Sequence, residues 1–399
     1  MKPDAAIEIV KELRSRGHEA YFVGGCVRDM VMQIEPADYD IATSATPDEV
    51  TAIFPRTETI GAQFGVVLVI KRGHPFEVAT FRSDEAYIDG RHPSGVVFTN
   101  AKQDVLRRDF TINGLLYDPL TSEVIDYVNG RADIHGGIVR AIGDPYARFE
   151  EDKLRILRAI RFGARLGYTI ERETWRAVCA MAPKIHQVSS ERVREELTRI
   201  LTEGRAAHGM TMLEESGLRT QILPELQWTD HIEKSLEFVG RGSPPDYAMG
   251  VLLHHTNVDL VRQIVERLKF SRAEMHHILA LVENLPRFSE VRRLPPSKLK
   301  RFFRLDRFDE HLKLARIHSM AAGEEPIDYA YAASKRLEWP DEQIWPPPLV
   351  TGDDLIAMGF SPGPRFKEIL TRVEDEQLEG RVTTREDAIQ FVRRNFGIV

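Results

Sequence analysis

Short apolar runs alternate with amphipathic segments along residues 1–140. Apolar positions repeating every three to four residues predict a helix over residues 4–17. Four apolar runs predict short strands, with a helix over 27–33 between the first two: 20–23, 39–43, 65–70 and 76–81. Thr46 and Pro47 form an N-cap and first-turn proline that open a further helix. This mixture predicts an α/β head in which helices cover a mixed sheet.

The strand pattern stops near Asp144, and helical spacing replaces it. Six segments carry this spacing: 149–166, 171–182, 190–203, 206–216, 246–269 and 272–285. The four prolines of Trp339–Pro348 predict a linker. We therefore expect an all-α neck over 141–203, a helical body over 204–338 and a tail over 349–399.

Composition narrows the class of protein. The chain has 399 residues, of which 29% are charged and 42% hydrophobic, which is typical of a soluble globular protein with several domains. No apolar run reaches a membrane-spanning length, no signal-peptide pattern is present, and Cys26 and Cys179 lack metal-ligand spacing. These features predict a cytoplasmic protein. The net charge of −7 argues against a protein that coats nucleic acid non-specifically, but it allows a local basic surface. No protein partner is evident.

Two short motifs near the N-terminus suggest phosphate chemistry. Gly24 and Gly25 precede Arg28, so backbone N–H groups and a guanidinium can approach one phosphate. Asp38 and Asp40 are two residues apart, which places both carboxylates on one face of a strand. Paired carboxylates can hold Mg²⁺ beside substrate phosphates. The alternatives are an ordinary turn and an exposed strand.

Further polar residues interrupt the apolar pattern of the head. Glu77 lies inside an apolar strand, where it either faces solvent or joins the aspartates as a metal ligand or proton acceptor. Arg108 follows another arginine and suits a triphosphate or ribose contact. Asp109 either caps a helix or belongs to the same site. Asn113 can reach that site if the segment between the two residues forms one helical turn.

The most specific pattern is the segment 151–165, which holds five cations and two acids. On a continuous helix, Arg155, Arg158, Arg161 and Arg165 form a ridge without matching acids, which an anion such as a triphosphate would neutralise. Asp152 and Arg155 together offer an acceptor and a donor. That pair matches the hydrogen-bonding edges of cytosine and adenine and excludes uracil and guanine. The alternative is an ordinary ion pair on a helix.

These motifs together resemble the tRNA nucleotidyltransferase/poly(A) polymerase family, specifically the bacterial class II CCA-adding enzymes. The resemblance rests on Gly24–Asp29, Asp38–Asp40, Arg107–Asn113 and Glu151–Phe162, with weaker likeness over 189–197 and 351–364. It implies a head, neck, body and tail, with two Mg²⁺ ions on Asp38 and Asp40. Residues at nucleotide-binding positions are Gly25, Arg28, Arg108, Arg158 and Arg161, and Asp152 and Arg155 select the base.

The resemblance also implies the reaction. CMP and AMP from CTP and ATP would be added to the tRNA 3′ end without a template, and pyrophosphate would leave. An enzyme that adds only A or only CC, or a poly(A) polymerase, fits the same base-selecting pair. Residues 83–103 resemble the flexible loop that helps the family change from C to A.

Body and tail are expected to hold the tRNA acceptor stem and elbow. Basic residues expected at phosphates are Lys298, Lys300, Arg301, Arg304, Arg365 and Lys367; a basic helix edge is the alternative. Many bacterial relatives carry a metal-dependent hydrolase domain with a His-Asp pair. Here 251–256 has His254 but no aspartate, so we expect a degenerate, RNA-binding body in which His254 is structural.

Overall fold

The computed structural model describes residues 2–58, 65–84 and 96–397. The chain divides into two compact units. Unit 1 comprises residues 1–228, 239–245 and 263–270, and unit 2 comprises 229–238, 246–262 and 271–399. The helices in the described ranges are all too short or too polar to cross a membrane.

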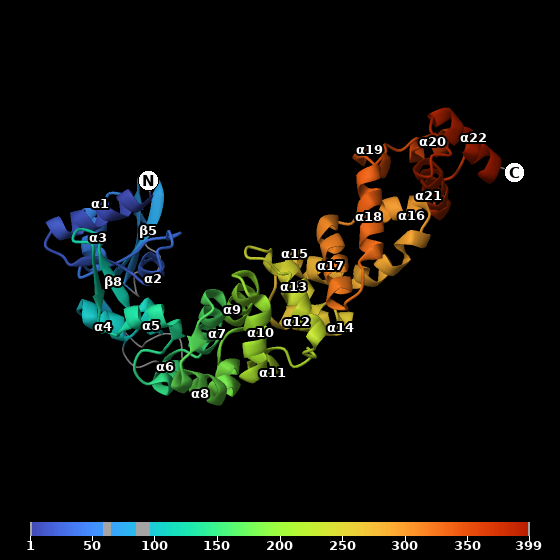
Figure 1. The fold of residues 1–399 in the computed structure, drawn as a ribbon. Coiled ribbons are helices and arrows are strands. Elements are labelled where there is room, and N and C mark those ends of the chain that lie inside the picture. The colour runs from blue at the N-terminus through green and yellow to red at the C-terminus, as the bar shows by residue number, and fades with distance from the viewer. Residues whose placement is uncertain (1, 59–64, 85–95, 398–399) are drawn as a thin grey trace. The chain divides into compact units, whose positions relative to one another are not determined.

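Unit 1 begins with a mixed seven-stranded sheet, which confirms the predicted α/β head (Figure 1). Its strand order is β3-β4-β5-β2-β1-β8-β9. In that order the bounds are Thr57–Glu58, Val66–Lys71, His74–Thr80, Asp40–Thr43, Ala20–Val23, Leu115–Asp118 and Glu123–Asp126. Among the described strand pairs of this sheet, only β2–β5 is parallel, and Ile41 pairs with Val78 there. The sequence predicted β1, β2, β4 and β5 but not β3, β8 and β9, of which β3 and β9 lie at the two edges of the sheet.

Helices cover this sheet. They are α1 (Lys2–Ser15), α2 (Gly25–Val31), α3 (Pro47–Ile53), α4 (Ala101–Leu106) and α5 (Gly130–Gly136). The predicted cap of α3 is present as a capping box, in which the Glu49 N–H donates to Thr46 Oγ1 and the Thr46 N–H donates to Glu49 Oε2. Ala101 and Val105 of α4 pack with Leu116 of the sheet. A separate two-stranded sheet pairs β6 (Arg82–Asp84) with β7 (Val96–Phe98).

The rest of unit 1 is mostly helical. It contains α6 (Pro145–Glu151), α7 (Leu154–Leu166), α8 (Arg172–Met181), α9 (Ser190–Thr202), α10 (Ala206–Glu215) and α11 (Leu218–Ile222). The single helix expected over 149–166 is wrong. Asp152 adopts an extended conformation, with φ −144°, and its side chain accepts from the Leu154 N–H. A short parallel pair, β10 (Ile138–Val139) with β11 (Thr169–Ile170), also continues strand structure beyond Asp144.

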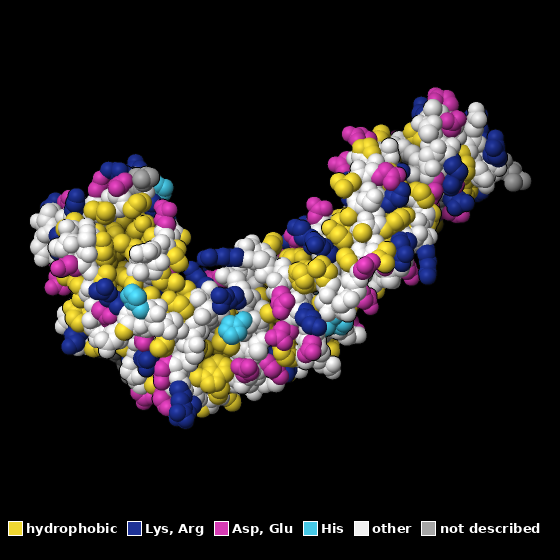
Figure 2. Space-filling model, in the orientation of Figure 1, with side chains coloured by type: hydrophobic (Ala, Val, Ile, Leu, Met, Phe, Trp, Pro, Cys, Tyr) yellow, Lys and Arg dark blue, Asp and Glu magenta, His cyan; other side chains and the backbone are white. Residues whose placement is uncertain are grey.

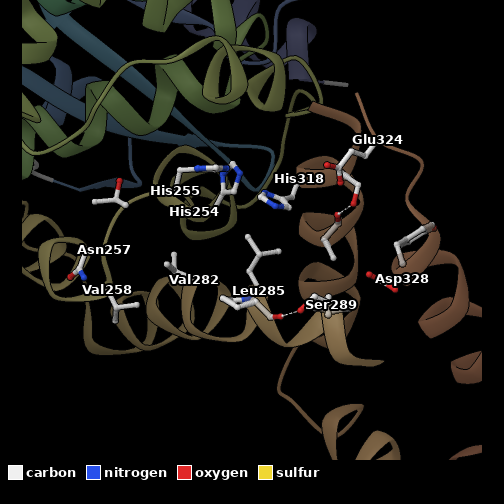
Figure 3. Close-up of a pocket in the computed structure, with 16 residues that line it drawn as sticks. His254, His255, Asn257, Val258, Val282, Leu285, Ser289, His318, Glu324 and Asp328 are labelled. Atoms are coloured by element: carbon white, nitrogen blue, oxygen red, sulfur yellow. Dashed lines mark hydrogen bonds between the residues drawn. The ribbon is translucent and has the colours of Figure 1, made fainter. Parts of the chain in front are cut away.

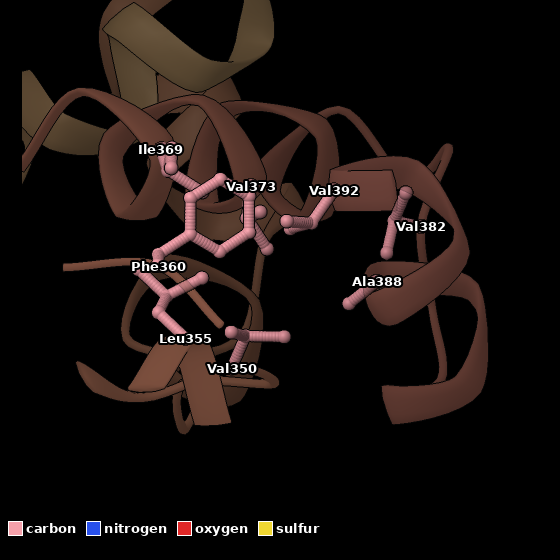
Figure 4. Close-up of a cluster of buried hydrophobic side chains, with 8 residues drawn as sticks. All are labelled: Val350, Leu355, Phe360, Ile369, Val373, Val382, Ala388 and Val392. Carbon is pink, nitrogen blue, oxygen red and sulfur yellow. The ribbon is translucent and has the colours of Figure 1, made fainter. Parts of the chain in front are cut away.

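Unit 2 is helical throughout its described residues. Its helices, of which α14 also extends into unit 1, are α12 (Asp230–Leu236), α13 (Pro245–Leu253), α14 (Val258–Arg267), α15 (Arg272–Asn284), α16 (Pro296–Phe302), α17 (Phe308–Ala321), α18 (Ile327–Glu338), α19 (Asp341–Ile344), α20 (Gly352–Ala357), α21 (Pro364–Leu378) and α22 (Arg385–Phe396). The helix expected over 246–269 is therefore two helices, and α19 lies inside the expected linker. The C-terminal helices enclose their own apolar cluster, which includes Leu355, Ile369 and Val392 (Figure 4).

Candidate active site

A polar cavity of about 460 Å³ opens in unit 1. Ten of the residues singled out from the sequence line it: Gly24, Gly25, Arg28, Asp38, Asp40, Arg108, Asp109, Asn113, Arg158 and Arg161. Glu77, Asp152 and Arg155 do not line it. Segments that are more than a hundred residues apart in the sequence thus meet in one cavity.

The acidic side of the site lies where β2 begins. Asp40 opens β2, and the parallel register places Glu77 of β5 opposite it. Burial raises the pKa of Asp40 to about 6, and the charges of Glu77 and Asp38 add to this rise. Asp38 is largely exposed, and its carboxylate lies 2.5 Å from the ammonium of Lys2. Three carboxylates that repel one another, with an ammonium already at one of them, form a site suited to a divalent cation.

The two glycines allow arginines to lie against the backbone. Gly24 has φ +75°, a conformation that favours glycine. A Cβ at Gly24 would lie 3.5 Å from the guanidinium of Arg108, and one at Gly25 would lie 3.6 Å from that of Arg28. Any larger side chain would compete with these guanidinium groups for the same space. The sequence interpretation of a glycine–arginine cradle agrees with this geometry.

A chain of hydrogen bonds fixes the polar floor of the cavity. Arg28 donates to Asn113 Oδ1 at 2.8 Å, and the Asn113 amide donates to Asp109 at 3.2 Å. Arg158 donates twice to the other oxygen of Asp109, at 2.6 and 2.8 Å. Burial alone would raise the pKa of Asp109, but the charges of Arg158 and Arg155, together with the hydrogen bonds from Arg158 and Asn113, outweigh burial and hold that pKa well below its usual range. Asp109 is therefore an ionised anchor for Arg158.

The prediction that the arginine ridge lacks matching acids is wrong. Each guanidinium has a carboxylate within 3.5 Å, and the pairs are Arg155–Glu151, Arg158–Asp109, Arg161–Glu196 and Arg165–Glu203. Three of these acids come from other segments of the fold, so neighbouring positions in the sequence could not reveal them. Even so, six arginines and four aspartates line the cavity, and the buried Arg108 Nε has no hydrogen-bond acceptor among the described residues. The cavity is thus still suited to an anion.

The expected base-selecting pair lies at the break between α6 and α7. Asp152 accepts from Arg192 at 2.7 Å. Arg155 donates to Glu151 and to the carbonyl oxygens of Arg107 and Arg148. Among the described contacts, no side-chain hydrogen bond joins Asp152 to Arg155. Asp152 and Arg155 are thus held by different partners, and their role in selecting the base stays a prediction.

Several lining residues were missed from the sequence. They are Asp29, Phe162 and Arg199, whereas Arg165, which also lines the cavity, belongs to the predicted arginine ridge. Asp29 accepts from Arg28, and the Phe162 ring lies under the guanidinium of Arg161. Asp29 and Phe162 belong to motifs already quoted, so a signal for them existed. Arg199 reaches the cavity only because α9 packs on α7, which the sequence does not indicate.

The basic residues of unit 2 divide into two groups. Lys300 donates to the Leu378 carbonyl oxygen, Arg301 to Glu374 and Arg304 to Glu374. These contacts favour the structural alternative for all three residues. Lys298, Arg365 and Lys367 are exposed. Basic and acidic side chains are interspersed over the visible face of the helices (Figure 2). Of the expected loop over 83–103, residues 85–95 lie outside the described residues.

The fold and this cavity define a nucleotidyltransferase, and comparisons with known proteins agree. Residues 20–140 match the family model "Poly A polymerase head domain", 167–229 match "Probable RNA and SrmB-binding site of polymerase A", and 246–392 match tRNA nucleotidyltransferase domain 2. The chain belongs to the class II tRNA nucleotidyltransferase/poly(A) polymerase family.

CCA-adding enzymes are among the relatives that match over nearly the full length of the chain. Those of Geobacillus sp. and Streptococcus mutans are 31% and 34% identical, each over 98% of this chain and 96% of the relative. Among solved structures, the Bacillus stearothermophilus CCA-adding enzyme in complex with CTP aligns with a TM-score of 0.80 and 28% identity. That alignment covers 99% of this chain and 98% of the other.

Proposed function

We propose that this enzyme adds CMP and AMP, taken from CTP and ATP, to the 3′ end of tRNA and releases pyrophosphate. The observation that carries the proposal is the single cavity that unites the acidic residues with the arginines. Full-length similarity to CCA-adding enzymes supports the choice of substrates. Thermotoga maritima has a CCA-adding enzyme of the same fold solved with tRNA, which suggests the same class of acceptor.

The carboxylates of Asp38 and Asp40 would hold two Mg²⁺ ions, and Glu77 lies close enough to Asp40 to raise its pKa. When bound, Mg²⁺ lowers the pKa of the attacking 3′-hydroxyl and offsets charge at the α-phosphate. Arg28, Arg108 and Arg158 would orient the triphosphate, and Asp109 keeps Arg158 in place. The resulting geometry would present the α-phosphate to the tRNA 3′-hydroxyl.

The extent of addition separates this proposal from its alternatives. Purified protein is incubated with labelled CTP or ATP and with tRNAs that end without CCA, after one C or after CC. We expect CMP on the first two acceptors and AMP on the third. Failure to incorporate CMP would favour A-only addition, failure to incorporate AMP would favour CC-only addition, and long A tracts would favour a poly(A) polymerase.

The metal site is tested by Asp40→Ala. This change should abolish incorporation from both nucleotides while tRNA binding, measured by filter retention, stays within a few-fold. The control is Asp48→Ala, which removes an exposed carboxylate from α3 of the same sheet domain and should leave the rate unchanged. Retained incorporation in Asp40→Ala would remove that residue from the metal site.

Base choice is tested by Asp152→Ala and Arg155→Ala. Either variant should incorporate UTP or GTP more readily relative to CTP and ATP, because the pair offers hydrogen bonds that only C and A complement. Competition between labelled nucleotides measures the ratio. Arg192→Ala, which removes the partner of Asp152, should shift the same ratio in the same direction but less. Unchanged selectivity in Asp152→Ala and Arg155→Ala would mean that base choice lies elsewhere.

A further inference from the structure

Four histidines meet in unit 2, far along the chain from the carboxylates of the head. His231 belongs to α12, His254 and His255 follow the end of α13, and His318 belongs to α17. One ligand nitrogen from each lies within 4.8 Å of all the others. Figure 3 shows His254, His255 and His318 grouped at one edge of a cavity of about 600 Å³. The sequence singled out His254 alone, and the structure brings three further imidazoles beside it.

The spacing of the histidine nitrogens is compatible with metal ligation. The Nε2 atoms of His231 and His254 face each other at 3.2 Å. Two imidazole nitrogens on a tetrahedral zinc ion, each about 2.0–2.1 Å from the metal, lie about 3.3 Å apart. The Nδ1–H of His254 donates to the Val251 carbonyl oxygen at 2.6 Å, which leaves the lone pair on Nε2. A hydrogen bond from the other ring nitrogen to a carbonyl oxygen commonly orients a metal-binding imidazole.

The cluster also has unused binding capacity. The buried Nδ1 of His318 has no hydrogen-bond partner among the described residues. His255 is exposed and provides an entry path. With no ion bound, the buried Nδ1 of His318 has no hydrogen-bond partner among the described residues, which costs stability.

We propose that His231, His254, His255 and His318 together bind one divalent transition-metal ion of the zinc type. Four nitrogen ligands favour Zn²⁺, Co²⁺, Ni²⁺ or Cu²⁺. Mg²⁺ prefers oxygen ligands, so this site is chemically distinct from the one proposed at Asp38 and Asp40. The ion joins α12, the end of α13 and α17, and thereby stabilises unit 2. The ligands are spread over residues 231–318, so no short motif reveals them.

The test uses the full chain, stripped with a chelator and kept in excess Mg²⁺ so that the head carboxylates are saturated. Zinc is titrated calorimetrically, and retained metal is measured by mass spectrometry after gel filtration. We expect one Zn²⁺ per chain and a rise in melting temperature on binding. Cobalt should give the visible absorption of a tetrahedral nitrogen site. Absence of stoichiometric zinc in the wild-type chain would overturn the proposal and leave a cluster of stacked imidazoles.

Variants locate the ion. His254→Ala should weaken zinc binding by at least 100-fold and abolish the cobalt absorption. The matched control is His276→Ala, which removes an exposed imidazole from α15 of the same unit and should leave binding unchanged. If circular dichroism shows that His254→Ala does not fold, His255→Ala serves in its place because His255 is exposed. Undiminished zinc binding in the folded variant, or equal loss in His276→Ala, would refute the assignment.

Discussion

Removal of the Asp109 carboxylate should destabilise unit 1 strongly. Asp109 is 8% exposed and accepts two hydrogen bonds from Arg158, one from Asn113 and one from the Phe110 N–H. Breaking a buried ion pair by deleting one partner costs about 3–5 kcal/mol. The Arg158 side chain is 31% exposed, so water recovers part of its hydration. We expect Asp109→Ala to lower the free energy of unfolding by about 3 kcal/mol.

The measurement is urea unfolding followed by tryptophan fluorescence. Trp175 and Trp228 belong to unit 1, so Trp339→Phe and Trp345→Phe in the background restrict the signal to that unit. This restriction is needed because a chain with two units need not unfold in one step. The matched control is Glu173→Ala, which breaks an exposed pair with Arg176.

The control pair Glu173–Arg176 should contribute less than about 1 kcal/mol to the free energy of unfolding, because both side chains are at least half exposed. The pH dependence adds a second criterion. The pKa of Asp109 is depressed on folding, so its contribution is complete above the unfolded value of about 4 and is lost as the pH falls below it. The difference in the free energy of unfolding between Asp109→Ala and the wild type should therefore become smaller at acidic pH. An Asp109→Ala effect no larger than that of Glu173→Ala would refute the reasoning.

Two further outcomes follow from the contacts. Lys300→Ala should destabilise unit 2 by about 1–2 kcal/mol in thermal melting, since its buried ammonium donates to a carbonyl oxygen, whereas Lys298→Ala should change stability by less than about 0.5 kcal/mol. Equal losses of stability in Lys300→Ala and Lys298→Ala would mean that the Lys300 hydrogen bond does not stabilise unit 2. At pH 8, iodoacetamide should modify Cys179 at least tenfold faster than Cys26, because burial raises the pKa of Cys26 to about 11. Peptide mass spectrometry measures the ratio, and faster labelling of Cys26 would contradict its burial.

The sequence predicted the cavity better than it predicted the contacts within it. Glycine spacing and the two aspartates could be interpreted locally, because Gly24 and Gly25 are adjacent and Asp38 lies just two residues before Asp40, where β2 begins. The acids that pair with the arginine ridge could not, because Glu196 and Glu203 reach α7 only through packing of α9. The helix break at Asp152 was missed because apolar periodicity continues across it. The histidine cluster likewise depends on tertiary packing.

The pairing of arginines with acids has a consequence for repeated turnover. A cavity lined by unpaired guanidinium groups would depend on a bound anion to limit charge repulsion, and loss of pyrophosphate would leave it strained. Here Glu196 and Glu203 neutralise α7 internally. If this cavity holds the nucleotide as we propose, it can stand empty between successive additions and keep its shape. An incoming triphosphate finds its guanidinium groups already arranged, so little of its binding energy is spent on reorganising the protein.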